Sequence, residues 1–153
     1  MSDLREYISQ VKKIKQLKTI KSKVSTKYEI AGVTAKVDQS HAVLFENIKE
    51  SDFRLVSNLV GTRKRFALAV GGTESNIHQK VISAIKNAKT PKIIPTGKFM
   101  ENKSKNINSM PIVTHFEKES GPFITSSVAY AKNPETGKQN SSFHRMMPID
   151  KTH

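Results

Sequence analysis

The sequence predicts an α+β fold, in which a mixed α/β domain is followed by a β-hairpin. Helical patterns of apolar residues alternate with short apolar runs over residues 1–90. A connector rich in Pro, Lys and Asn follows at residues 91–110, where apolar periodicity is weak. Two β-rich segments then flank a turn sequence within residues 111–153. These three observations divide the 153-residue chain at 1–90, 91–110 and 111–153.

The first segment has the pattern of an amphipathic helix. Its apolar residues recur at spacings of three and four, and they are Leu4, Tyr7, Ile8, Val11 and Ile14. Ser2 or Asp3 can cap this helix, because a short side-chain oxygen accepts a hydrogen bond from a free backbone N–H. An imperfect alternation of apolar and polar residues from Leu17 to Val24 predicts a strand.

Another helix opens after a sequence that resembles a capping box. Ser25 and Thr26 are followed by Glu29, and the helix is expected to continue through Val37. Two further strands are expected in this domain, at residues 42–45 and 54–59, and two further helices, at residues 61–70 and 77–88. Gly71-Gly72 should end the first of these helices, and Thr73 or Ser75 should cap the second.

A hairpin is predicted near the end of the chain. Residues 123–130 and 141–147 have β patterns, and the sequence between them holds a strong turn signal. Pro134 fixes φ and Gly137 accepts a positive φ, so we expect a loop of four or five residues. A lone two-stranded hairpin is marginally stable in water, so it must pack on the first domain or on a partner.

Composition excludes several classes of protein. The chain has no cysteine, which rules out disulfides and thiolate metal sites. No apolar run approaches the roughly 20 residues of a membrane helix, and the N-terminus is too charged for a signal peptide. These features predict a cytoplasmic protein that does not enter a membrane.

The net charge of +13 indicates a strongly basic surface. Seven lysines fall between Lys12 and Lys27, a density that suits a nucleic-acid surface, a solvated helix face or a surface that meets an acidic partner. Base stacking needs aromatic residues among the cations, and only Tyr7 and Tyr28 lie nearby. We therefore rank nucleic-acid binding below the other two interpretations.

Seven short sequences now combine into a specific resemblance. They are Leu4–Ile8, Lys27–Ala31, Ala42–Ile48, Val56–Arg63, Gly121–Thr125, Asn133–Gly137 and the run Asn140-x-Ser142-x-x-Arg145. In this order and at these separations they resemble the N-terminal part of the UbiD family of decarboxylases. The resemblance covers nearly all of this chain but only about the first third of a typical family member.

The resemblance implies a fold and a set of cofactors. Family members have an N-terminal α/β domain, a central split β-barrel that binds prenylated FMN, and a C-terminal domain that drives oligomerisation. This chain is similar to the first domain plus the opening hairpin of that barrel. The family also uses a divalent metal, Mn²⁺ or Mg²⁺, and a monovalent cation, for which K⁺ is the candidate.

The resemblance also implies roles for residues of the last run. Asn140 takes the place of a metal ligand, and Ser142, Phe143 and His144 take positions that line the flavin. Arg145 matches an arginine beside the flavin and the substrate carboxylate, part of a Glu-Arg-Glu catalytic set. An amide oxygen suits Mg²⁺ or Mn²⁺, and a guanidinium suits a carboxylate.

Strand alternation alone does not bring these residues into one pocket. It places Asn140, Ser142 and His144 on one side of a strand and Ser141, Phe143 and Arg145 on the other. On the residues alone, a hairpin at a sheet edge with ordinary polar residues therefore remains an alternative interpretation. The other histidines show no ligand spacing and are interpreted as surface residues; they are His41, His78, His115 and His153.

The rest of the family's active site has no match in this sequence. A His and a Glu that bind the metal, and both catalytic Glu, lie downstream of the hairpin in the family. The resemblance therefore implies a second chain that carries the rest of the barrel and the C-terminal domain. A shortened gene product and a degenerate, non-catalytic paralogue are the alternatives, and alone the chain is expected to be inactive.

The expected reaction is non-oxidative loss of CO₂ from a small α,β-unsaturated or aromatic carboxylic acid. The Ser-Phe-His-Arg-Met form of the motif, at residues 142–146, is most similar to archaeal members that decarboxylate anhydromevalonate phosphate in isoprenoid synthesis. The basic composition suits a phosphorylated acid, although +13 is more charge than one substrate needs.

Overall fold

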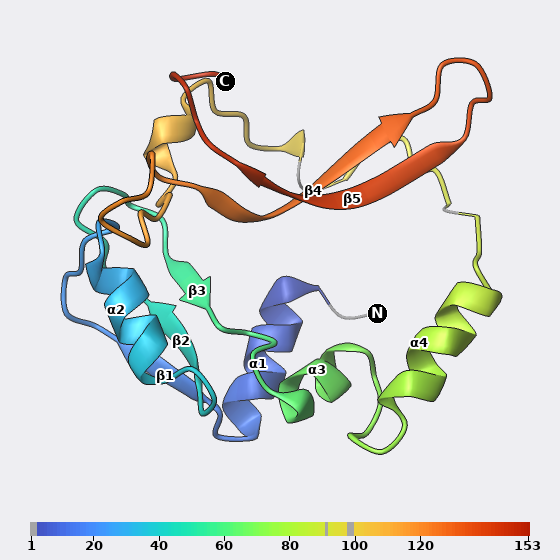
Figure 1. Ribbon diagram of the computed structural model, residues 1–153, viewed down its shortest axis with the longest axis horizontal. Coiled ribbons are helices and arrows are strands. Elements are labelled where there is room, and N and C mark those ends of the chain that lie inside the picture. The colour runs from blue at the N-terminus through green and yellow to red at the C-terminus, as the bar shows by residue number, and fades with distance from the viewer. Residues whose placement is uncertain (1–2, 91, 98–99) are drawn as a thin grey trace.

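The computed structural model describes residues 3–90, 92–97 and 100–153. It shows a mixed α/β unit with a long hairpin lying across it (Figure 1). The elements in chain order are α1 (Leu4–Lys13), β1 (Leu17–Ile20), α2 (Glu29–Lys36), β2 (Ala42–Phe45), β3 (Leu55–Ser57), α3 (Arg63–Ala69), α4 (Ile77–Lys86), a 3-10 helix (Ile107–Ser109), β4 (Ile124–Lys132) and β5 (Gln139–Met146). The predicted mixture of helices and strands is confirmed.

Helix α1 forms as its sequence predicts. The side chain of Asp3 caps it, because Oδ1 accepts a hydrogen bond of 2.8 Å from the backbone N–H of Glu6. Its apolar face buries Tyr7 and Val11 against Ala42 of β2. Ser2, the other predicted cap, lies outside the described residues.

The first unit is built on a three-stranded sheet in the order β1-β2-β3. Strand β1 runs parallel to β2, with Leu17 opposite Ala42, and β2 runs antiparallel to β3. Strand β1 ends at Ile20 rather than at Val24, which instead makes an isolated bridge to Ile48. Strand β3 also ends earlier than predicted, because Asn58 adopts a positive φ of 56° that turns the chain away from the sheet.

The capping residues of two helices differ from the prediction. Helix α2 begins at Glu29 after Tyr28, whose φ is 69° and whose side chain makes no capping bond. Half of the expected capping box exists, since Glu29 Oε2 accepts a hydrogen bond of 2.7 Å from the backbone N–H of Ser25. The hydroxyl of Ser25 donates to Glu50 Oε1 at 2.5 Å, and its oxygen accepts from the backbone N–H of Lys27 at 3.0 Å, ahead of the helix, rather than from an N–H of α2.

Helix α4 is capped by neither Thr73 nor Ser75. These two hydroxyls bond each other at 3.0 Å, and Asn76 occupies the capping position. The side-chain oxygen of Asn76 accepts from the backbone of Thr73 and stabilises the preceding turn rather than the helix. Helix α3 follows its prediction more closely, with Thr62 as its cap and Gly71 at a φ of 65° after its end.

The main core lies between α2 and the sheet. Its buried side chains are Val24, Ile30, Val43, Phe45, Ile48 and Val113. Burial of each such side chain contributes about 1.5–3 kcal/mol relative to exposure. Val113 comes from the C-terminal part of the chain, so this core includes residues from both sides of the connector.

A buried arginine joins α1, the sheet and α3. Arg65 is 0% exposed, and its guanidinium donates to the carbonyl oxygens of Ser40 at 2.8 Å, Leu59 at 3.2 Å and Asn58 at 3.2 Å. A further bond of 3.1 Å reaches Gln16, at Oε1. Burial lowers the pKa of Arg65, which starts so high that the group stays charged at neutral pH.

Replacement of Arg65 by Met is expected to destabilise the fold. The variant removes every guanidinium hydrogen bond to the part-buried acceptors on Gln16, Ser40, Asn58 and Leu59, so the free energy of unfolding should fall by about 3 kcal/mol or more. Urea denaturation of wild type and variant measures the change. Lys64→Met is the matched control, because Lys64 is an exposed neighbour in the same helix. An equal, small effect of the two substitutions would contradict a structural role for Arg65.

Acid should weaken the start of α2 through Glu29. A hydrogen bond from Lys49 at 2.9 Å, and then the backbone N–H of Ser25, lower the pKa of Glu29. A lowered pKa means that this stabilisation is present above the pKa of the unfolded chain and is lost as the pH falls through the folded value. The thermal midpoint of Glu29→Gln should therefore depend less on acid pH than that of wild type. Glu135→Gln, an exposed carboxylate in the hairpin loop, is the control.

Candidate functional site

The base of the hairpin is fastened to the first unit by two residues. Val113 is buried in the main core, and the next residue, Thr114, exchanges backbone hydrogen bonds with the start of α2. Its N–H donates to Thr26 at 3.1 Å, and its carbonyl accepts from Tyr28 at 3.0 Å. The N–H of Phe123 donates to Val113 at 3.0 Å, so the residue just before β4 is also held at this junction.

The predicted hairpin is present, with a loop one residue longer than its expected upper limit. Strand β4 pairs antiparallel with β5, and the loop runs from Asn133 to Lys138. The side chain of Asn133 accepts from the backbone of Glu135 and Thr136, at 2.9 and 2.8 Å. Gly137 has a φ of 67°, as the turn sequence predicts.

One face of the hairpin carries three of the predicted site residues. The register places Asn140, Ser142 and His144 of β5 opposite Ala131, Ala129 and Ser127 of β4. The hydroxyl of Ser142 lies 2.8 Å from Nε2 of His144, so these two side chains share a face as alternation requires. Their partners on β4 are all small residues.

The opposite face of the hairpin exposes two large aromatic side chains. Phe143 is paired with Val128, and Tyr130 is paired with Ser141. Phe143 is 86% exposed and Tyr130 is 71% exposed. Large aromatic side chains at such exposure are characteristic of a surface that another element covers.

Arg145 lies apart from the polar face, at the junction with the first unit. Its guanidinium carbon stands 4.2 Å from the ring centroid of Phe123, and Nη1 lies 3.7 Å from Oε1 of Glu119. Among residues 3–90, 92–97 and 100–153, no hydrogen bond or ion pair joins Arg145 to Asn140, Ser142 or His144. The structure thus brings Ser142 and His144 together and places Arg145 at a separate point of the same strand.

Sequence reasoning missed the residues that surround Arg145. Glu119 and Phe123 were assigned no role beyond the loop and strand patterns, and His115 was interpreted as a surface histidine. His115 is only partly exposed, and its Nδ1 lies 3.7 Å from Oε2 of Glu119. The one signal in the sequence is position, because Glu119 lies two residues before Gly121, where the Gly121–Thr125 sequence that carries the resemblance begins.

The residues present do not make a metal site by themselves. In the part of the chain that the structure describes, no group of three or more His, Cys, Asp or Glu side chains could hold a metal ion. Asn140 is exposed and offers one neutral oxygen. The polar face fits one side of a flavin better, because its hydroxyl and imidazole groups lie beside small residues.

The lysines of the lysine-rich stretch are exposed. All seven lysines from Lys12 to Lys27 are exposed, and no acidic residue lies between Tyr7 and Tyr28. Tyr7 is buried and donates its hydroxyl to the carbonyl of Arg65 at 2.7 Å, so it cannot stack on a base. One of the two aromatic residues near this stretch is therefore unavailable to nucleic acid.

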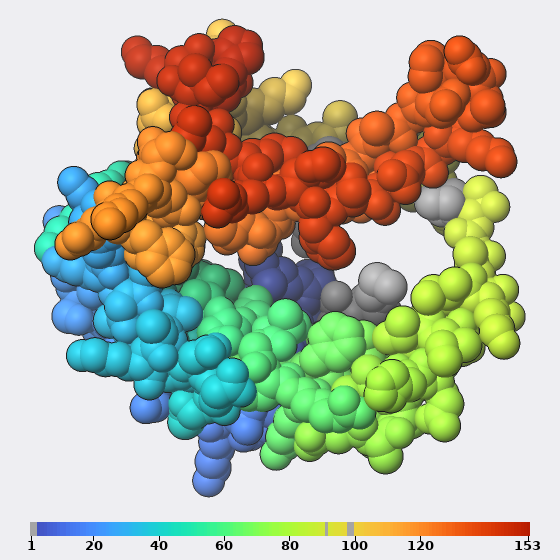
Figure 2. All heavy atoms as spheres, in the orientation of Figure 1, coloured from blue at the N-terminus to red at the C-terminus, as the bar shows by residue number. Residues whose placement is uncertain are grey.

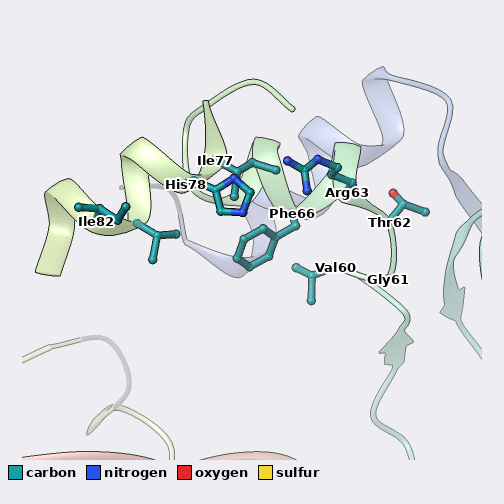
Figure 3. A pocket seen from close by; sticks show the side chains of 9 residues that line it. Val60, Gly61, Thr62, Arg63, Phe66, Ile77, His78 and Ile82 are labelled. Atoms are coloured by element: carbon teal, nitrogen blue, oxygen red, sulfur yellow. The ribbon is translucent and has the colours of Figure 1, made fainter. Parts of the chain in front are cut away.

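A hollow lies between α3 and α4. It is lined largely by apolar side chains, including Val60, Phe66 and Ile82, and the rings of Phe66 and His78 border it (Figure 3). Arg63, at its rim, donates to the carbonyl of Glu74 at 3.0 Å. No carboxylate lines this hollow, and it holds none of the predicted site residues.

None of the helices in the described ranges is long and apolar enough to cross a lipid bilayer.

Two family profiles match consecutive parts of this fold. The family profile described as the N-terminal domain of 3-octaprenyl-4-hydroxybenzoate carboxy-lyase matches residues 8–85. The profile of the Rift-related domain of the same carboxy-lyase matches residues 89–153. The chain belongs to the UbiD family.

Individual relatives agree with this assignment. The chain is 33% identical over 132 residues to the anhydromevalonate phosphate decarboxylase of Methanothermobacter thermautotrophicus, covering 85% of this chain and 30% of that protein. It resembles the UbiD-class enzyme HmfF of Pelotomaculum thermopropionicum, solved in complex with FMN, at a TM-score of 0.91 and 27% identity. That match covers 97% of this chain and 35% of HmfF.

An evolved dimeric form of the same HmfF, solved in complex with prFMN, matches with a TM-score of 0.89 and 26% identity. This match covers 99% of the chain and 37% of that enzyme. The chain therefore spans about a third of the length of the relatives that it matches.

Shortening Val113 should weaken the junction that holds the hairpin. Val113→Ala removes two buried carbon atoms from the main core, which is expected to lower the free energy of unfolding by about 1.5–3 kcal/mol. Hydrogen exchange should also show faster exchange of the Phe123 amide, whose acceptor is the carbonyl of Val113. Val128→Ala, on the exposed hairpin face, is the control. Unchanged exchange at Phe123 would contradict the fastening role.

Proposed function

We propose that this chain supplies the N-terminal α/β domain and the opening hairpin of the split β-barrel in a UbiD-type decarboxylase. In this proposal the α/β domain spans residues 1–90, the connector spans residues 91–110, and the hairpin region spans residues 111–153. The observation that carries the proposal is the hairpin itself. It presents the Asn140–Arg145 run on β5, with Arg145 directly at the junction with the first unit.

The proposed reaction is non-oxidative decarboxylation of an α,β-unsaturated or aromatic acid. Anhydromevalonate phosphate is the specific candidate, supported by the relative of that name and by the form of the motif around His144. The basic composition of the chain favours an anionic substrate of this kind.

Arg145 is the proposed catalytic residue of this chain. Its side chain is 64% exposed, so donor groups remain accessible to a substrate carboxylate after the contacts with Phe123 and Glu119 are made. The planar guanidinium can bind a carboxylate with two parallel hydrogen bonds and orient the bond that breaks. Its fixed positive charge also suits it to hold an anionic substrate in that orientation.

The polar face of the hairpin is the proposed flavin surface. Ser142 and His144 can hydrogen-bond to a phosphate or to a ring edge, whereas Phe143, also expected to line the flavin, lies on the opposite face of β5. Prenylated FMN, when bound, supplies the electron sink that accepts electron density as CO₂ leaves. Asn140 is the proposed single ligand from this chain to Mn²⁺ or Mg²⁺, with K⁺ as an additional cation.

The proposal also needs groups that lie outside this sequence. A second chain that carries the rest of the barrel and the C-terminal domain would supply the other metal ligands and the two catalytic Glu. The exposed aromatic residues Phe143 and Tyr130 support this, because a barrel closed around the hairpin would cover them. A degenerate, non-catalytic chain is the competing possibility, and activity in the assembled enzyme separates the two.

Reconstitution tests the proposal directly. Co-expression of this chain with the rest of a UbiD-type enzyme and with a flavin prenyltransferase should give CO₂ release from the acid substrate. Arg145→Ala should lower kcat/KM by about a hundredfold or more, as expected for loss of a charged group that acts on the transition state. Lys138→Ala, an exposed cation in the hairpin loop, should leave activity unchanged. Equal activity of Arg145→Ala and wild type would remove Arg145 from the mechanism.

A further inference from the structure

We propose that Glu119 is a positioning residue that fixes the guanidinium of Arg145 from the segment fastened to the first unit. This inference rests on the proposed function, in which Arg145 binds the substrate carboxylate. The ion pair between Glu119 and Arg145 is an additional feature, because Glu119 lies outside β5 and outside the motif that ends in Arg145.

The burial of Glu119 is the first observation. Its side chain is 8% exposed, whereas its neighbours Glu117 and Lys118 are exposed. A carboxylate removed from water must be compensated by hydrogen bonds or by a positive charge. Oε2 accepts a hydrogen bond of 2.8 Å from the backbone N–H of His115, which closes a tight loop and fixes the carboxylate. Oε1 is the oxygen that faces Arg145, at 3.7 Å from Nη1.

The mobility of an unsupported arginine is the second consideration. A long side chain on an exposed strand can occupy many rotamers, and ordering it costs conformational entropy. Two contacts restrict Arg145: the ring of Phe123 at 4.2 Å on one side of the guanidinium and the carboxylate of Glu119 near one of its nitrogens. The guanidinium has five N–H donors, so donors remain for a substrate after this pairing.

Both contacts come from one anchored segment. Glu119 and Phe123 lie on the stretch that begins at buried Val113, and Phe123 donates its backbone N–H to the carbonyl of that valine. Arg145 itself lies on β5, which pairs with β4 and not with the sheet of the first unit. The orientation of the Arg145 side chain therefore depends on the segment that Val113 anchors in the core of the first unit, rather than on β5 alone.

Substitution of Glu119 by Gln separates the charge from the loop geometry. The amide oxygen of Gln can still accept from the backbone of His115, but the ion pair with Arg145 is lost. In the wild-type chain, the side-chain protons of Arg145 near the Phe123 ring should show an upfield ring-current shift in the proton NMR spectrum. Glu119→Gln should lose most of this shift, and Glu119→Asp, which keeps the charge, should retain part of it.

Glu117→Gln is the matched control, because it removes the same charge from an exposed position two residues away. It should leave the ring-current shift of Arg145 unchanged. Persistence of the full shift in Glu119→Gln, with the hairpin amide resonances unchanged, would overturn the proposal. Collapse of the shift together with the hairpin resonances would also overturn it, since it would mean that Glu119 only maintains the fold.

The assembled enzyme gives a second, separable readout. Glu119→Gln should lower kcat/KM about tenfold, less than Arg145→Ala, and Glu119→Asp should recover part of the loss. If Arg145→Ala has no effect on activity, the proposed function of Arg145 fails while the NMR result still decides the ion pair. If Arg145→Ala is inactive and Glu119→Gln is fully active, the positioning role alone fails.

Discussion

The insertion of Val113 and Thr114 into the first unit is the constraint on which the rest of the structure depends. A two-stranded hairpin has too little buried surface to hold a fixed position by itself. Here its base is held by a buried valine and by backbone hydrogen bonds to the start of α2, and its far end extends over α4 (Figure 1). The space-filling view shows an opening between the hairpin and the α3–α4 region (Figure 2). The polar run on β5 is therefore held at one end and accessible along much of its length.

A second constraint acts inside the first unit and explains why that unit can serve as an anchor. The guanidinium of Arg65 binds main-chain carbonyls and a glutamine rather than a buried carboxylate. Each of these acceptors belongs to a turn between elements, so one side chain holds several loops at once. None of these four acceptors is titratable, so the hydrogen bonds from the guanidinium persist over a wide range of pH.

The elements that the sequence predicted well are those that local interactions determine. Helix α1 with its Asp3 cap, the apolar run of β2 and the stop at Gly71 each depend on residues within a few positions of one another. The predicted caps of α2 and α4 failed because Ser25 and Thr73 bond to other partners, and one of those partners, Glu50, is 25 residues distant in the chain.

The same distinction applies to the site. The order of short motifs indicated β5 and its Asn-to-Arg run, because those residues are adjacent in sequence. It could not indicate Glu119, which meets Arg145 only after the hairpin folds back on the junction. Contacts between segments that are distant in the chain depend on the register of β4 with β5 and on a bulge between Ile124 and Ser127. Neither feature has a signature in the composition of a single strand.

The exposed aromatic face of the hairpin has a further consequence for the behaviour of the protein in solution. Phe143 and Tyr130 offer an apolar strip to any second molecule that approaches, while the net charge of +13 makes every such approach repulsive. Electrolyte shortens the range of that repulsion to about 8 Å at physiological ionic strength and leaves apolar attraction largely intact. The colloidal stability of the unassembled chain is therefore set by ionic strength: dilute buffer keeps copies apart, and concentrated salt favours their self-association through the strip.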